Sequence, residues 1–362
     1  GISLYHPLIV KLKKRGAVIT SLLNLWFSVP RQAKTICVTG TKGKSTTATL
    51  ITHILKGLGK RVLLLGNIGQ ALGTQNDDDM EYIVIEVSSY QAANFDQMCD
   101  IAVLTSLYPE HLDWHGSLEI YYRDKLNLLS HARTKIVNAQ CLEEMRHLGV
   151  SCDSLVMANT PEGFHANNGV IFDKDTPLLA IQNAYLLRWH NLNNVCVALT
   201  VIRQLGLETQ QVPQMLKDFH GLPHRQQELG TKDGVLYVDD SISTAPQSAI
   251  AAMENYAGRP VTLIAGGYDR GIDYAPLTDY IIEHRIHAVI CMGPSGERIH
   301  QALQAQKKTN LFSSSVMRDV IALAKKNTPS GGVILLSPAA PSYGLFKDFT
   351  ERGMAFAKES GF

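Results

Sequence analysis

The sequence has almost no excess charge, no long apolar run and no paired cysteines. Its 34 Lys and Arg residues nearly balance 33 Asp and Glu residues, which leaves a net charge of +1. A nearly neutral chain is not expected to bind nucleic acid or a membrane surface, because such partners usually require a basic excess. No apolar run reaches the roughly 18 residues that a membrane-spanning helix needs, and no signal peptide is evident.

The cysteine pattern also excludes several classes of protein. Six cysteines are scattered over 362 residues, and none forms a C-x-x-C pair. This spacing fits neither a zinc site nor a disulfide framework. A reducing cytoplasm fits best, and we expect a monomer that acts on small molecules.

The most informative segment is Thr-Gly-Thr-Lys-Gly-Lys-Ser-Thr-Thr at residues 39–47, directly after an apolar run. A strand, a glycine-rich turn and a helix in this order leave backbone N–H groups free to surround a polyphosphate. The lysine supplies charge, and the Ser hydroxyl can bind Mg²⁺. The spacing is two residues shorter than the common P-loop, but an ordinary turn would not explain Lys-Ser in phase with both glycines. The sequence therefore predicts ATP binding by Gly40, Thr41, Lys42, Gly43, Lys44, Ser45 and Thr46.

Apolar stretches and helical patterns alternate along the chain, which is typical of parallel sheets covered by helices. We predict strands at 35–38, 61–65, 82–87, 101–107, 134–137, 235–238, 261–265, 288–292 and 333–336. Helices are predicted at 45–58, 118–129, 247–256, 277–284, 297–305, 318–326 and 346–358, with a packed helix within 18–29. A helical pattern ends at Gly221-Leu222-Pro223, so a domain boundary is expected there. The fold class is α/β: a central P-loop ATPase domain with a mostly parallel sheet, then a C-terminal Rossmann-like α/β domain.

Three further positions could carry chemistry. Glu86 follows a predicted strand, and a carboxylate at that edge of the sheet is well placed to hold Mg²⁺. It could instead only cap the next helix. The loop that contains His111 could contribute metal ligands or be merely solvated. Lys125 alone would be interpreted as a surface lysine paired with Asp124 or Glu119.

Together these motifs resemble the Mur ligase family, and within it the branch that adds glutamate to UDP-N-acetylmuramoyl-L-alanine in peptidoglycan synthesis. The matching segments occur in the family's order from the first residues to the last. They are GTKGKS at 40–45, EVSSYQ at 86–91, H-x-D at 111–113 with Tyr121 and Lys125, HNLNN at 190–194, GLPHR at 221–225, DDS at 239–241, GGYD at 266–269, SPAAPS at 337–342 and F-x-x-R-G at 349–353.

The resemblance implies an ATP-dependent, ADP-forming ligase that works through an acyl phosphate. Phosphoryl transfer to a carboxylate brings two anions together and therefore depends on positioning and positive charge. The family's catalytic positions correspond to Lys44, Glu86, His111, Lys125 and Arg225. Two Mg²⁺ ions are implied, one on Ser45 and Glu86 and one on His111 and Lys125. A protonated lysine cannot bind a cation, so the family carbamylates this lysine with CO₂; an unmodified Lys125 is the alternative.

The remaining roles also come from the resemblance. Asn191 and Asn194 correspond to adenine-side residues, and Arg225 and Asp240 to residues that reach the γ phosphate and the ribose. This division implies domain closure before chemistry, with 221–223 as the hinge candidate. Substrate-side positions are Asn67, Ser88, Gln91 and His111 for the muramoyl peptide, and Thr244, Arg270, Ser342 and Phe349 for glutamate. Asn67 could equally be a turn residue, and Ser342 a helix cap.

Several departures from the family pattern concern the glutamate side. Ile242 replaces a lysine, Arg270 replaces the lysine that grips the side chain of D-glutamate, and Pro341 and Tyr343 flank Ser342. Arg presents a planar fork where Lys presents a point charge, so the pocket must differ. This variation resembles a branch of the family that joins L-glutamate, and on that resemblance we favour L-glutamate over D-glutamate.

The resemblance also suggests domain limits. Residues 1–21 resemble the end of a uridine-binding domain and a linker, residues 22–221 the central domain, and residues 222–362 the glutamate-binding domain. The chain is thus expected to start near the end of the first domain and to bind nucleotide sugar weakly in this form. The alternatives are a folylpolyglutamate-type ligase and a non-catalytic ATP-binding regulator.

Overall fold

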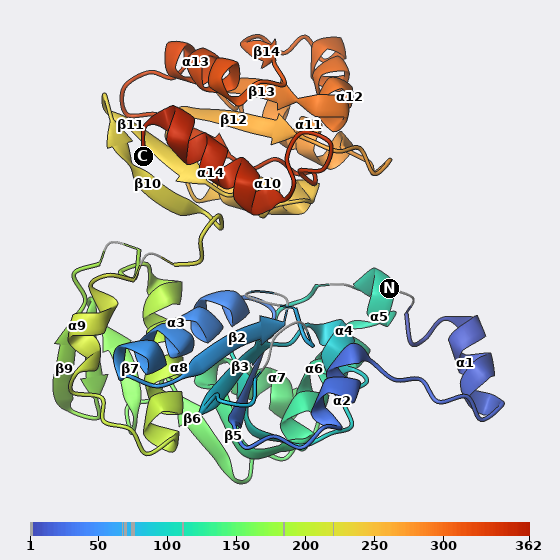
Figure 1. Ribbon diagram of the computed structural model, residues 1–362, viewed down its shortest axis with the longest axis vertical. Coiled ribbons are helices and arrows are strands. Elements are labelled where there is room, and N and C mark those ends of the chain that lie inside the picture. Colours follow the sequence, from blue (N-terminus) through green and yellow to red (C-terminus); the bar gives the residue numbers. More distant parts are fainter. Residues whose placement is uncertain are drawn as a thin grey trace. The chain divides into compact units, whose positions relative to one another are not determined.

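Parallel strands buried on both faces form the core of the first of two compact units, residues 1–219 and 220–362 (Figure 1). The computed structural model describes residues 3–362 except 67, 69, 70, 74–76, 111, 184 and 220, and only the backbone of 112 and 113. Within the described part of the chain, no helix is both long and apolar enough to span a lipid bilayer.

The main sheet of the first unit has six strands, all parallel, in the order β2-β3-β1-β4-β5-β6. The strands are β1 (Lys34–Thr39), β2 (Val62–Gly66), β3 (Tyr82–Glu86), β4 (Cys99–Leu104), β5 (Ala132–Asn138) and β6 (Leu155–Ala158). Long apolar runs suit strands that are covered on both faces. Because β1 pairs in parallel with both β3 and β4, the carboxyl ends of these three strands lie at one edge of the sheet. Ligands of open α/β sheets bind at this edge.

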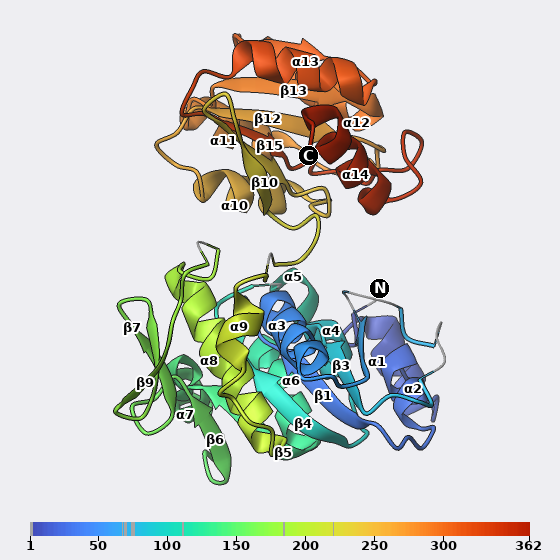
Figure 2. The same cartoon turned by 60° about the vertical axis from the view of Figure 1, so that its left-hand side comes forward.

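Helices cover both faces of this sheet. The helices of this unit are α1 (Pro7–Lys14), α2 (Leu22–Phe27), α3 (Lys44–Gly57), α4 (Ser89–Ala92), α5 (Leu112–His115), α6 (Leu118–Ser130), η1 (Ala139–Cys141), α7 (Leu142–His147), α8 (Trp189–Gln204) and α9 (Val212–Leu216). Helix α1 has no buried residue and lies apart from the sheet (Figure 1). Residues of α2, α6 and α7 share one apolar cluster with alternate residues of β1, β3 and β4. Helices α3 and α8 pack side by side (Figure 2).

A small antiparallel sheet extends the first unit. Its strands are β7 (Phe164–Asn167), β8 (Val170–Asp173) and β9 (Thr176–Ala180). Strand β7 packs against α8.

The second unit contains one six-stranded sheet in the order β10-β11-β15-β12-β13-β14, in which only the β10–β11 pair is antiparallel. Its strands are β10 (Gln227–Lys232), β11 (Val235–Asp239), β12 (Val261–Gly266), β13 (Ala288–Met292), β14 (Leu311–Ser313) and β15 (Val333–Leu336). Its helices are α10 (Pro246–Glu254), α11 (Ala275–Glu283), α12 (Gly293–Ala305), α13 (Met317–Asn327) and α14 (Phe349–Ser360). Alternate strand residues pack against α10–α12 on one face and against α13 and α14 on the other.

The predicted α/β class and mostly parallel sheets are confirmed, and two local predictions need correction. Of the helix expected within 18–29, only α2 forms, because Ser21 caps its N-terminus through the amide of Asn24. The strand expected over 101–107 ends at Leu104, since the next residues bond to the glycine-rich loop. The predicted domain limits and their roles stay a prediction.

Candidate active site

The loop between β1 and α3 has a conformation that requires glycine at two positions. Gly40 has φ +148°, and a Cβ there would lie 2.0 Å from Oγ1 of Thr105. Gly43 has φ +84° and is the N-cap of α3; a Cβ there would lie 2.6 Å from Oδ1 of Asn194. The loop therefore packs tightly on its neighbours and leads into the N-terminus of a 14-residue helix, whose amides and dipole favour an anion.

Residues that follow β4 hold this loop in place. Oγ1 of Thr105 donates to the carbonyl of Lys42 at 2.6 Å, and the amide of Lys42 donates to Oγ of Ser106 at 2.8 Å. The amide of Thr41 donates to the carbonyl of Ser106 at 2.8 Å. Sequence reasoning did not identify Thr105 and Ser106, because only the parallel pairing of β1 and β4 brings them to the loop.

Two lysines converge on the same loop carbonyl. Nζ of Lys44 donates to the carbonyls of Gly40 and Thr41 at 2.9 Å each, and Nζ of Lys125 donates to the carbonyl of Gly40 at 2.7 Å. The side chain of Lys42 is mostly exposed and forms a 2.8 Å ion pair with Glu110. Ser45 is buried and Thr46 half-buried in the first turn of α3. Positive charge is thus concentrated where a polyphosphate would bind.

Lys125 is one of the most buried side chains of the protein, with 1% of its surface exposed. Burial, followed by the nearby charge of Lys44, lowers the pKa of Lys125 to about 7. The interpretation of Lys125 as a surface lysine paired with Asp124 or Glu119 is therefore wrong: Asp124 pairs with His115, and Glu119 pairs with Arg123. A buried amine with such a pKa is available in its neutral, nucleophilic form near pH 7.

Glu86 is the last residue of β3, in register with Val38 of β1, and it is 3% exposed. Its Oε2 atom is buried and has no hydrogen-bond partner among the described residues. The alternative role of Glu86 as a helix cap is wrong, because Ser88 caps α4 and forms a capping box with Gln91. A buried carboxylate oxygen without a partner is costly unless a cation or proton joins it, and so Glu86 suits a metal ion.

Two predicted site residues, His111 and Asn67, lie outside the described residues. In the described part of the chain, no group of three or more His, Cys, Asp and Glu residues is placed to hold a metal ion. His115, from the same motif as His111, is fully buried and bonded to Asp124 and Ser89. His115 ends helix α5 and is enclosed by protein, so this part of the motif is not a solvated loop.

The two asparagines of α8 face the loop. Oγ1 of Thr47 donates to Oδ1 of Asn194 at 3.2 Å, and Nδ2 of Asn194 donates to Oδ1 of Asn191 at 3.3 Å. Nδ2 of Asn191 donates in turn to the carbonyl of Tyr185 at 2.8 Å. The structure thus places Asn194 at the N-terminal end of α3, with Asn191 bonded behind it.

In the second unit, Asp240 lies buried at the end of β11. Its carboxylate accepts from Oγ of Ser337 at 2.6 Å and from the amide of Gln226 at 3.1 Å. Burial raises the pKa of Asp240 to about 6, against the opposing effect of its hydrogen bonds and of Arg225. His224 and Gln226, on either side of the exposed Arg225, have φ of +61° and +45°. Such backbone strain is often found at ligand sites.

Arg352 connects the other segments of the second unit that carry motifs. It is 1% exposed, and its guanidinium donates to Oγ and the carbonyl of Ser241 and to the carbonyl of Ala340. Oγ of Ser241 donates to the carbonyl of Phe349 at 2.7 Å. Burial lowers the pKa of Arg352 to about 10. Of the predicted glutamate-side residues, Ser342 is buried, Thr244 half-buried, and Phe349 and Arg270 exposed.

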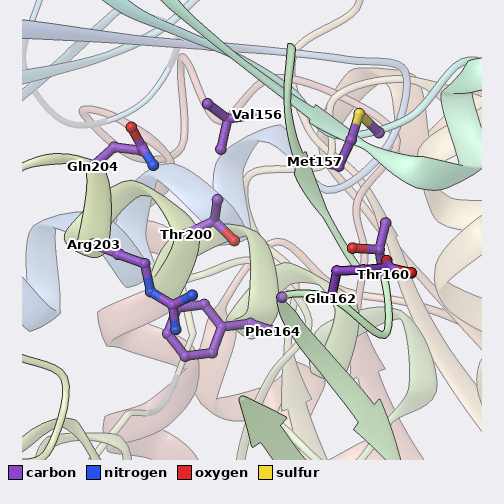
Figure 3. A pocket seen from close by; sticks show the side chains of 9 residues that line it. Val156, Met157, Thr160, Glu162, Phe164, Thr200, Arg203 and Gln204 are labelled. Atoms are coloured by element: carbon purple, nitrogen blue, oxygen red, sulfur yellow. The ribbon is translucent and has the colours of Figure 1, made fainter. Parts of the chain in front are cut away.

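A hollow of about 250 Å³ in the first unit lies away from these residues (Figure 3). It is formed by the β6–β7 turn and the C-terminal half of α8, about 13 Å along the helix from Asn194. Arg203 in its wall lies 3.7 Å over the ring of Phe164 and forms a 2.6 Å ion pair with Asp173. Since its main cation is already paired, the hollow is not the site that the loop predicts.

Comparison with known proteins agrees with this geometry. The Mur ligase middle domain matches residues 38–202, and the Mur ligase, glutamate ligase domain matches residues 224–340. The chain is 39% identical to the UDP-N-acetylmuramoyl-L-alanine--L-glutamate ligase of Micromonospora sp., over 99% of this chain and 80% of that protein. It is 35% identical to the protein of the same name from Xanthomonas campestris pv. campestris, over 100% of this chain and 81% of that protein.

Solved structures share the fold at low identity. The MurF ligase from Thermotoga maritima in complex with ADP has a TM-score of 0.57 at 18% identity, over 95% of this chain and 85% of that chain. The bifunctional folylpolyglutamate synthase/dihydrofolate synthase from Yersinia pestis has a TM-score of 0.63 at 18% identity, over 99% of both chains. The two domain matches, the similar sequences and the shared architecture all indicate the same family. The chain therefore belongs to the Mur ligase family.

Proposed function

We propose that this protein is an ATP-dependent ligase that joins L-glutamate to UDP-N-acetylmuramoyl-L-alanine, with ADP and phosphate as the other products. The observation that carries the proposal is the position of Lys125, buried with its Nζ 2.7 Å from the carbonyl of Gly40 in the glycine-rich loop. Its relatives named L-glutamate ligases, at up to 39% identity across nearly the whole chain, support the same assignment.

The first unit contains the groups that ATP requires. We assign residues 40–46 to the polyphosphate, with the amides at the start of α3 as donors and Lys44 as the charge on the β and γ phosphates. We assign Asn191 and Asn194 to the adenine side. Ser45 and Glu86 would hold one Mg²⁺, and the buried, partnerless Oε2 of Glu86 fits a cation ligand.

A second Mg²⁺ is assigned to His111 and to Lys125 in its carbamylated form. Only an unprotonated amine adds to CO₂, and the pKa of Lys125 near 7 keeps much of it unprotonated at neutral pH. Carbamylation would convert a buried cation into an anion suited to Mg²⁺. Bound Mg²⁺ would supply charge neutralisation between the phosphates and the attacking carboxylate.

The chemistry needs two anions to approach each other in a site that excludes water. The substrate carboxylate attacks the γ phosphorus, the bond to the β-phosphate oxygen breaks, and ADP leaves with its charge balanced by Lys44. The neutral amine of glutamate then attacks the acyl carbon, phosphate leaves, and the amine loses a proton. Preorganised positive groups lower the barrier because they need not reorient as charge develops.

The remaining assignments follow the family positions. Ser88, Gln91, Asn67 and His111 are assigned to the muramoyl substrate, and Arg225 and Asp240 to the γ phosphate and the ribose. Thr244, Arg270, Ser342 and Phe349 are assigned to glutamate. Arg270 in place of the family's lysine implies a different carboxylate geometry, and the relatives named L-glutamate ligases support the L isomer.

The proposal is tested by an amide-forming assay with UDP-N-acetylmuramoyl-L-alanine, ATP and Mg²⁺, offering L-glutamate and D-glutamate separately. We expect ADP and product in equal amounts with L-glutamate only. Glu86→Gln should reduce the rate at least 100-fold, whereas Glu81→Gln, immediately before the opposite end of the same strand, should change it less than twofold. Preference for D-glutamate would refute the stereochemical assignment.

Two further measurements distinguish the proposed function from the folylpolyglutamate-type ligase and the non-catalytic regulator. A folylpolyglutamate-type ligase would form product with a folate acceptor and fail with the muramoyl acceptor. A regulator would bind ATP but release no phosphate that depends on both acceptor and glutamate.

A further inference from the structure

A buried histidine bridges the two segments that supply Glu86 and Lys125. Nδ1 of His115 lies 2.6 Å from Oδ2 of Asp124, and its Nε2 lies 3.1 Å from Oγ of Ser89. His115 is 0% exposed, Ser89 2% and Asp124 7%. Asp124 directly precedes Lys125 on α6, and Ser89 begins α4, three residues after Glu86.

The spacing of Ser89, His115 and Asp124 is that of a nucleophilic triad, but burial excludes this role. A nucleophile must reach its substrate, and all three side chains are enclosed. Aromatic rings surround the imidazole: Tyr90 stacks on it with ring centroids 5.6 Å apart, and Tyr121 meets it edge-on at 5.1 Å. The ring therefore has little freedom to move, and both hydrogen bonds hold a defined direction.

Asp124 is held from its other side as well. The hydroxyl of Tyr5 donates to Oδ1 of Asp124 at 2.6 Å. Burial, together with this bond to Asp124, raises the pKa of Tyr5, so the phenol remains a donor. Both oxygens of the carboxylate thus have partners, the buried His115 on one side and the more exposed Tyr5 on the other. This arrangement fixes the turn of α6 that presents Lys125.

We propose that His115 is a positioning residue: it sets the separation between the Glu86 segment and the Lys125 helix, and so places the Lys125 amine against the glycine-rich loop. The proposal rests on the proposed function for its catalytic consequence but not for its structural one. Side chains that hold reacting groups matter because a displacement of about 1 Å can reduce turnover by about 100-fold.

The test is His115→Phe, which keeps a ring between Tyr90 and Tyr121 but removes both hydrogen bonds. His115→Asn is the conservative variant, because its amide can occupy the position of Nδ1 and keep the bond to Asp124. His53→Phe is the matched control: it removes one histidine bond of 2.7 Å, to the carbonyl of Met215, elsewhere in the same unit. All proteins are assayed at a temperature at which each is folded by circular dichroism.

We expect His115→Phe to lower kcat by about 10- to 100-fold with the KM for ATP within threefold, His115→Asn to recover part of kcat, and His53→Phe to match the wild type. A crystal structure of His115→Phe should show the contact of Lys125 Nζ with the Gly40 carbonyl lengthened beyond hydrogen-bond range. A retained contact overturns the proposal whatever the activity, and a lost contact with unchanged kcat overturns its catalytic consequence. An inactive wild type would refute the proposed function alone, since the crystal structure still decides the positioning role.

Discussion

Replacement of Lys125 by Met should change how the stability of the protein depends on pH. Lys125 is 1% exposed, and burial, aided by the charge of Lys44, lowers its pKa from 10.5 to about 7. Met has a similar shape and no charge. The variant therefore removes a buried ammonium and the hydrogen bond to Gly40 while it keeps most of the packing.

The size of the effect follows from the pKa. A tenfold change in a protonation equilibrium corresponds to about 1.4 kcal/mol, so a fall in pKa from 10.5 to about 7 corresponds to about 5 kcal/mol of lost stability while the amine is protonated in both states. Below pH 7 this cost is complete. Between pH 7 and 10.5 the unfolded chain binds the proton and the folded chain does not, so the stability of the wild type rises with pH. Because about half of the folded protein still binds the proton at pH 7, the wild type should gain about 2 kcal/mol relative to Lys125→Met between pH 7 and 9.

Urea unfolding at pH 6, 7, 8 and 9 measures this difference, in metal-free buffer purged of CO₂ so that the amine stays unmodified. Lys56→Met, which removes an exposed lysine of α3, controls for the loss of one positive charge. If the difference between wild type and Lys125→Met stays flat from pH 7 to 9, Lys125 is not desolvated as the structure indicates, and the argument for its neutral amine fails.

Three other substitutions have defined outcomes. Gly40→Ala would place a Cβ 2.0 Å from Oγ1 of Thr105, so ATP affinity measured by calorimetry should fall at least 100-fold; unchanged affinity would refute the role of the loop. Burial raises the pKa of the Asp240 carboxyl to about 6, and Asp240→Asn removes this carboxyl. The variant should therefore be more stable than the wild type by up to about 3 kcal/mol above pH 6, and this difference should vanish below about pH 4. Arg352→Met leaves the buried acceptors of Ser241 without a donor and should cost about 3 kcal/mol in urea unfolding; a loss below 1 kcal/mol would contradict the proposed network.

The strands that were predictable from the sequence are those buried on both faces. Ala288–Met292 and Val333–Leu336 were predicted at their observed limits, because a short uninterrupted apolar run is typical of a parallel strand that is buried on both faces. No helix was predicted at Trp189–Gln204, where residues 195–202 are all buried and give no polar face to mark a 3.6-residue period. The strands of the small sheet, β7 to β9, were also not predicted, since they are short and partly exposed.

The same division holds for the site. The glycine-rich loop was predictable because its chemistry lies within a few consecutive residues. The residues that support it are far away in sequence: Thr105 and Ser106 reach it only through the pairing of β1 with β4. The burial of Lys125 and the bridge through His115 likewise depend on how α4 and α6 pack. This packing cannot be predicted from a short segment of the sequence.

Each of the two units buries ionisable groups, and their burial costs folding free energy. In the first unit, Oε2 of Glu86 has no hydrogen-bond partner among the described residues, and burial lowers the pKa of Lys125 to about 7; in the second unit, burial raises the pKa of Asp240 to about 6. Each of these states costs folding free energy. Because these groups have already lost their water when the protein folds, a bound cation or phosphate does not have to remove it again, and its interaction with them is strengthened by the low local dielectric. The folding free energy that is lost by burying these groups therefore increases the affinity for ligands of the complementary charge.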